Sequence, residues 1–81
     1  YINKMADIKV LKKEEMQDKV GINAGLVWNT LYAEDGRLEF KALKKVTKLT
    51  DKELYMAFGW LLREGKLDVK EEEKDIFISL L

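Results

Sequence analysis

The reactive side chains of this sequence are too few to build a familiar catalytic constellation. Ser79 is the single serine, and the chain has neither cysteine nor histidine. A Ser/His/Asp or Cys/His site therefore cannot be assembled, and the commonest metal ligands are missing. The closest carboxylates form the run Glu71 to Glu73, which we expect at an exposed turn as surface charges. The sequence thus predicts a protein that is not an enzyme, with no metal site, no cofactor and no evident small-molecule substrate.

Lysine is the residue type that remains for binding chemistry. From Arg37 to Lys48 five basic residues stand against one acidic residue, Glu39, a net charge of +4. The four lysines are three or four residues apart, so they share one face of a helix; they are Lys41, Lys44, Lys45 and Lys48. Such a stripe can contact the phosphates of duplex DNA, although an ordinary solvated lysine face is the alternative. If it binds DNA, the binding should be weak and salt-sensitive.

A helix with marked ends follows this stripe. Thr50 and Glu53 have the spacing of a capping box, and Gly65 suits the left-handed conformation that ends a helix. The apolar residues in between recur at helical spacing and predict the buried stripe Leu54, Ala57, Phe58, Leu61 and Leu62. This helix is expected at the structural centre of the fold.

The outward face of the same helix is a mixed surface. Lys52 and Arg63 are candidate nucleic-acid contacts, whereas Met56 and Gly59 offer no hydrogen-bonding group to a base. Asp51 and Glu53 would face phosphates with like charge. The face is therefore poorly equipped to recognise a DNA sequence.

The chain has two tryptophans, each at a position of helical character. Trp28 lies in an apolar helical stripe and is expected in the core. Trp60 is expected to pack beneath the C-terminal hairpin, against Val69 or Ile78. If Trp60 is exposed instead, it forms a patch with Met56, and an aromatic residue beside a methionine is typical of a protein interface.

The remaining pattern completes three helices and a hairpin. The apolar stripe Val20, Ala24, Val27, Trp28, Leu31 and Tyr32 predicts a helix over Val20 to Glu34. A turn at Glu34 to Arg37 and a short strand over Leu38 to Phe40 follow, and then a helix over Lys41 to Lys48 with Ala42, Leu43 and Val46 inward. After Gly65, alternating apolar residues predict a β-hairpin with the tip at Lys70 to Asp75. The tip is acidic, which opposes a phosphate backbone.

The first 19 residues form a segment whose structure the pattern leaves open. Ile8, Val10 and Leu11 suit a short strand, whereas the run KKEEMQDK favours a helix. Met5 is one candidate for the natural start, with Tyr1 to Lys4 either a remnant or an extension. We therefore divide the chain into an N-terminal segment, 1–19, and a domain, 20–81.

Composition agrees with one small domain. The chain has 81 residues, 47% of them hydrophobic, and 15 basic residues balance 15 acidic ones. A balanced charge gives no global attraction to nucleic acid or to an anionic membrane. No apolar run approaches the length of a membrane span, and no signal peptide opens the chain. We expect a cytoplasmic protein.

The order of the expected elements is that of an α+β winged helix-turn-helix: a three-helix core, a short strand before the second helix, and a C-terminal hairpin as the wing. Two stretches support this plan, GINAGLVWNTL from Gly21 to Leu31 and AFGWLLREGKL from Ala57 to Leu67. They resemble a family of small bacterial and archaeal winged helix-turn-helix proteins of unknown function. The resemblance covers about Val20 to Leu80 and implies the fold, with DNA binding by analogy.

Two functions fit these features. The first is a nucleic-acid-associated module, similar to transcription regulators, that uses the lysine stripe with Lys52 and Arg63. The second is a scaffold for protein association, with itself or with another protein, through Met56, Trp60 and the wing. The residues alone support the two functions about equally, and the family resemblance favours the first.

Overall fold

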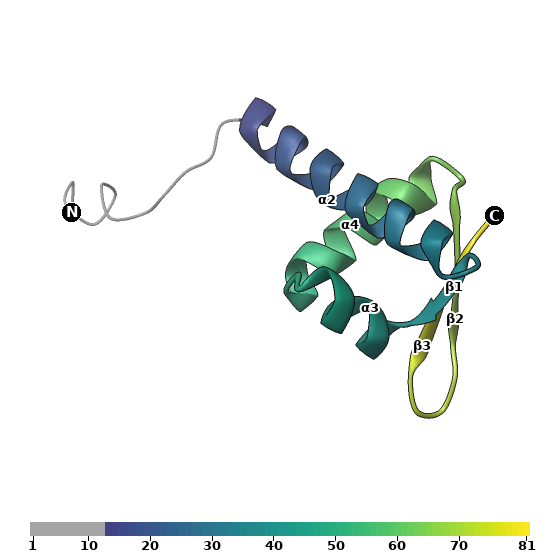
Figure 1. The fold of residues 1–81 in the computed structure, drawn as a ribbon. Helices are drawn as coiled ribbons and strands as arrows, with labels where there is room; N and C mark the ends of the chain where they lie inside the picture. Colours follow the sequence, from purple (N-terminus) through teal and green to yellow (C-terminus); the bar gives the residue numbers. More distant parts are fainter. Residues whose placement is uncertain (1–12) are drawn as a thin grey trace.

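The computed structural model describes residues 13–81, which form three helices and one three-stranded antiparallel sheet (Figure 1). The elements follow in the order α2 (Lys13–Ala33), β1 (Arg37–Glu39), α3 (Phe40–Thr47), α4 (Asp51–Arg63), β2 (Leu67–Glu71) and β3 (Ile76–Leu80). The α+β architecture predicted from the sequence is confirmed. The strand considered at Ile8, Val10 and Leu11 lies outside the described residues.

Helix α2 is longer than its apolar pattern. It begins at Lys13, whereas the periodicity placed the start at Val20. The added turns are polar and lie beyond the core, so hydrophobic spacing could not mark them. Their acidic residues Glu14 and Glu15 suit the positive end of a helix dipole. The KKEEMQDK run is therefore helical from Lys13 onward.

The inward face of α2 is narrower than predicted. Four residues of the stripe are buried: Val20, Ala24, Val27 and Leu31. Trp28 is half-buried and packs against the core, while Tyr32 is 69% exposed. The expectation that Tyr32 faces inward was wrong, because its ring stacks on Trp28 at the helix surface, with the ring centroids 5.2 Å apart.

The turn after α2 is the predicted one. Asp35 and Gly36 both have positive φ, 60° and 85°, and the Gly36 amide donates to the Leu31 carbonyl at 2.7 Å. Strand β1 begins at Arg37, and Phe40 already opens α3 instead of ending the strand. Strand β1 pairs antiparallel with β3, so the short strand does join the hairpin.

Helices α3 and α4 form the helix-turn-helix. The predicted capping box at Thr50 is present, and Gly65 ends the second helix with φ 71°. In α3, Leu43 is buried but Val46 is 56% exposed. In α4, Leu62 is 46% exposed, because it lies about 80° around the helix from Leu54. The inward assignments of Val46 and Leu62 were therefore wrong.

The core is one cluster that all three helices and the sheet share. Its members are Ala24, Val27, Leu31, Leu43, Leu54, Ala57, Phe58, Leu61, Leu67 and Ile78. Phe40 joins α3 to α4, since its ring stacks on Tyr55 and meets the edge of Phe58. The sheet, in which the strands lie in the order β1-β3-β2, covers one side of this core.

The hairpin projects beyond the helices as a wing (Figure 1). Val69 pairs with Ile78, and Leu67 and Ile78 are buried, which confirms the predicted alternation. The strands run further than expected, because Lys70 and Glu71 pair with β3. The tip is therefore confined to residues 72–75.

Candidate functional site

Four lysines surround a shallow hollow at the helix-turn-helix. The hollow lies between α3 and the start of α4, and its lining is Lys41, Lys44, Lys45, Lys48, Leu49, Thr50 and Asp51. We call the four lysines together the lysine surface. All four are exposed. The structure thus brings together the lysine stripe that helical spacing predicted and sets it beside the α4 N-terminus.

The charge of the lysine surface is mostly uncompensated. Lys44 Nζ lies 2.6 Å from Asp51 Oδ1, an exposed ion pair. Within residues 13–81, no carboxylate pairs with Lys41, Lys45 or Lys48. The amide end of α4 lies at the same place, although Asp51 and Glu53 in its first turn offset the positive end of the helix dipole. Three free ammonium groups therefore face solvent from one hollow.

Lys48 has an unusual backbone conformation. It ends α3 in the left-handed region, with φ 61° and ψ 21°, and its amide donates to the Lys44 carbonyl at 2.8 Å. Glycine or asparagine usually occupies such a position, because a Cβ is strained there. A lysine in this conformation is locally strained, and strained residues are frequent at functional positions.

The outward face of α4 carries the other two basic candidates. Lys52 lies at the start of the helix and Arg63 at its end, about 16 Å apart by helical rise. The exposed side chains between them are largely apolar: Tyr55 at 54%, Met56 at 47%, Leu62 at 46% and Trp60 at 37%. This face is more apolar than electropositive.

Trp60 does not lie beneath the wing. Two of its ring carbons are 3.7 and 3.8 Å from the position that a Cβ on Gly21 would take. The indole therefore packs against α2 at Gly21. The prediction that Trp60 contacts Val69 or Ile78 was wrong. The position of a residue around its own helix does not reveal which other helix or strand that residue faces.

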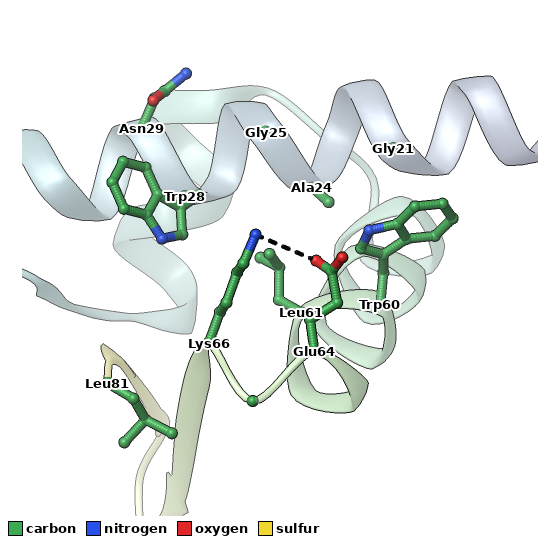
Figure 2. A pocket seen from close by; sticks show the side chains of 11 residues that line it. Gly21, Ala24, Gly25, Trp28, Asn29, Trp60, Leu61, Glu64, Lys66 and Leu81 are labelled. Atoms are coloured by element: carbon green, nitrogen blue, oxygen red, sulfur yellow. Dashed lines mark ion pairs between the residues drawn. The ribbon is translucent and has the colours of Figure 1, made fainter.

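A second hollow was not predicted from the sequence. It is a groove of about 680 Å³ between α2 and the end of α4. Figure 2 shows Trp28 and Trp60 at its two ends, with the ion pair between Glu64 and Lys66, 3.6 Å apart, lying between them. Gly21 and Gly25 give it a flat wall. The signal in the sequence was their four-residue spacing.

Other chemistry receives little support from the part of the chain that the structure describes. In residues 13–81 no three acidic side chains converge as a metal site. None of the described helices combines the length and the apolar character that a membrane crossing needs. At the wing, Glu39, Glu72, Glu73, Lys74, Asp75 and Phe77 surround an acidic hollow.

Three helices, a helix-turn-helix with a capped second helix, and a hairpin beside it define a winged helix-turn-helix domain. The chain belongs to the winged helix-turn-helix domain family DUF2582, whose model matches residues 12–80. It is also similar to the uncharacterized protein MJ1608 of Methanocaldococcus jannaschii, with 37% identity over 73 residues. That match covers 83% of this chain and 97% of the archaeal protein.

Proposed function

We propose that this domain binds the phosphate backbone of nucleic acid through the lysine surface. The observation that carries the proposal is the convergence of Lys41, Lys45 and Lys48, free of carboxylate partners among residues 13–81, on the hollow at the start of α4. In helix-turn-helix complexes the helix before the recognition helix crosses the backbone. Helix α3 holds that position here.

The binding is proposed to be independent of sequence. Phosphate contacts position a protein on a duplex, whereas base-edge contacts specify the site. On α4 the exposed Met56 and Gly59 present no donor or acceptor to a base edge. The wing adds repulsion, since Glu71, Glu72 and Glu73 are exposed at or beside its tip. The duplex therefore approaches from the α3 side, with Lys52 and Arg63 as peripheral contacts.

A salt titration tests this proposal. Affinity for a short generic duplex, measured by fluorescence anisotropy, should fall steeply between about 50 mM and about 200 mM salt. The triple variant Lys41→Gln/Lys45→Gln/Lys48→Asn removes three charges, and asparagine keeps the left-handed conformation at position 48. It should lower the slope of log K against log salt by about 3.

A matched variant controls for net charge. Lys66, Lys70 and Lys74 are exposed lysines away from the lysine surface, and their replacement by glutamine removes the same charge. This control should leave the salt slope unchanged. Absence of binding by the unmodified chain at low salt would refute the proposal, as would equal losses in the two triple variants.

A second function, protein association, is favoured by a different observation. The described helices expose large apolar side chains that a small monomer would ordinarily bury, including Ile22, Tyr55 and Met56. Aromatic residues and methionine are enriched in protein interfaces. Sedimentation of the chain over a range of concentrations tests self-association directly, and a constant monomer mass would contradict that form of the function.

A further inference from the structure

The outer face of α2 carries large apolar side chains although it faces solvent, beside the polar Asn29. From Val20 to Ala33 the helix has no charged residue over fourteen positions. Its inner side packs in the core, yet on its outer side Ile22 is 72% exposed and Leu26 is 40% exposed. A helix that is apolar on all sides is usually buried on all sides. Among residues 13–81, however, no segment covers Ile22 and Leu26 on this outer face.

The exposed face has a ridge and a groove side by side. Ile22 and Leu26 are four residues apart and form the ridge. Gly21 and Gly25, also four apart, form a row without side chains directly beside it. The Trp60 ring lies against Gly21, whereas at Gly25 an added Cβ would meet no described atom within 4 Å, so the row is open at Gly25. Rows at this spacing are the ones that interdigitate when two helices pack.

The tryptophans extend the same face. Trp60 bounds the Gly21 end of the groove, and a smaller hollow lined by Gln17, Asp18, Gly21, Ile22 and Trp60 joins the ridge to it. Trp28 bounds the other end, as Figure 2 shows. The ion pair of Glu64 and Lys66 lies between the two tryptophans, as Figure 2 shows. The patch thus combines apolar and charged groups, as protein interfaces do.

We propose that a second copy of this chain covers this face, with the Ile22–Leu26 ridge of each copy packed against the open Gly25 part of the groove of the other. The proposal rests on the second of the proposed functions and names its surface and its partner. A two-fold interface uses one patch on both molecules, so it requires a protrusion and a matching hollow next to each other. The adjacent ridge and groove on α2 meet that requirement.

Charge supports a second copy in an antiparallel arrangement. The charged end of α2 is its N-terminal part, where Glu14, Glu15 and Asp18 lie. With the contact centred between Ile22 and Leu26, the two-fold axis sets Asp18 of one copy near the uncharged Thr30 of the other. Two parallel helices would instead bring the acidic ends together. Only between Val20 and Ala33, where α2 has no charged residue, do the two helices approach without like-charge contact.

Two exposed glycines give a decisive test by sedimentation equilibrium. Gly25→Ala places a methyl group in the groove, whereas Gly59→Ala places one on α4, where an added Cβ also meets no described atom within 4 Å. Both variants gain helix propensity, so both should raise the thermal midpoint of the monomer. Gly25→Ala should nevertheless weaken the dimer at least tenfold, while Gly59→Ala leaves the dimer constant unchanged.

A ridge variant completes the experiment. Ile22→Glu should give a folded monomer, whereas Val46→Glu, at a similarly exposed position on α3, should remain a dimer. A strict monomer for the unmodified chain up to about 1 mM would overturn the proposal and leave the face to a different partner. Equal effects of Gly25→Ala and Gly59→Ala would also overturn it. Neither result would alter the salt slope for DNA, so failure here is separable from failure of the nucleic-acid proposal.

Discussion

Thr50 and Glu53 exchange two hydrogen bonds at the start of α4. The Thr50 amide donates to Glu53 Oε1 at 2.9 Å, and the Glu53 amide donates to Thr50 Oγ1 at 3.2 Å. The first amides of a helix lack intrahelical partners, so this exchange fixes where α4 begins. It also fixes the turn that holds the lysine surface against the α4 N-terminus.

Removing the cap should destabilise the domain measurably. Thr50→Ala leaves the Glu53 amide without its side-chain acceptor and is expected to cost about 1 kcal/mol of unfolding free energy. Thr30→Ala is the control, because the Thr30 hydroxyl donates to the Leu26 carbonyl of its own helix, at 2.7 Å. That change should be neutral or slightly stabilising. Urea denaturation of the two variants measures the difference, and equal losses would contradict the role of the cap.

The same contact makes part of the stability dependent on pH. The hydrogen bond from the Thr50 amide, the Thr50 hydroxyl and the nearby Lys19 lower the pKa of Glu53 below its ordinary value of 4.5. A lowered carboxyl pKa contributes stability above the unfolded pKa, and that contribution is lost as the pH falls through the folded pKa. The thermal midpoints of the unmodified chain and of Glu53→Gln should therefore differ by a constant amount near neutrality and converge below pH 4.5. Parallel curves into the acid range would refute this link.

Local signals made the helix-turn-helix and the wing predictable. The capping pair at Thr50, the Asp35-Gly36 turn and the alternation around Ile78 each depend on residues close in the chain. Local rules of this kind state a backbone conformation directly. The lysine stripe was predictable for the same reason, because helical spacing alone gathers its members on one face.

Contacts between distant elements were not predictable in the same way. The place of Trp60 depends on how α4 packs on α2, since its ring lies against Gly21, which is 39 positions away in the sequence. Leu62 and Tyr32 satisfy apolar spacing yet lie at the edge of the buried arc, where the neighbouring helix decides their exposure. The start of α2 was missed because polar turns beyond the core have no apolar period.

Leu43 should carry much of the stability that α3 contributes. It is fully buried, whereas Val46 in the same helix is 56% exposed. Leu43→Ala is expected to cost about 2–5 kcal/mol, since it leaves a cavity where α3 meets the core. For a domain of this length the total is about 4–12 kcal/mol, so the variant should be marginal. Val46→Ala should cost well under 1 kcal/mol, and similar midpoints for the two in urea would contradict the packing.

Lys48 should show a conflict between stability and binding. Lys48→Gly relieves the left-handed conformation and is expected to gain about 0.5–1 kcal/mol, measured by denaturation. Because it also removes one phosphate contact, the salt slope for duplex DNA should fall by about 1. Asp35→Gly is the matched control, since Asp35 has nearly the same φ, 60°, outside the lysine surface. It should gain less stability, because aspartate tolerates the left-handed conformation better than lysine, and it should keep the slope. An unchanged slope in Lys48→Gly would exclude Lys48 from the contact.

Gly59 offers a test of whether the outer face of α4 needs to remain flat. Glycine in the middle of a helix costs about 0.5–1 kcal/mol relative to alanine, and at position 59 a methyl group meets open space among the described residues. Gly59→Ala should therefore raise the thermal midpoint without a packing penalty. If duplex affinity is also unchanged, the duplex does not approach this part of α4, as the α3-centred proposal requires. A loss of affinity in this more stable variant would instead show close contact at Gly59 and place α4 in the groove.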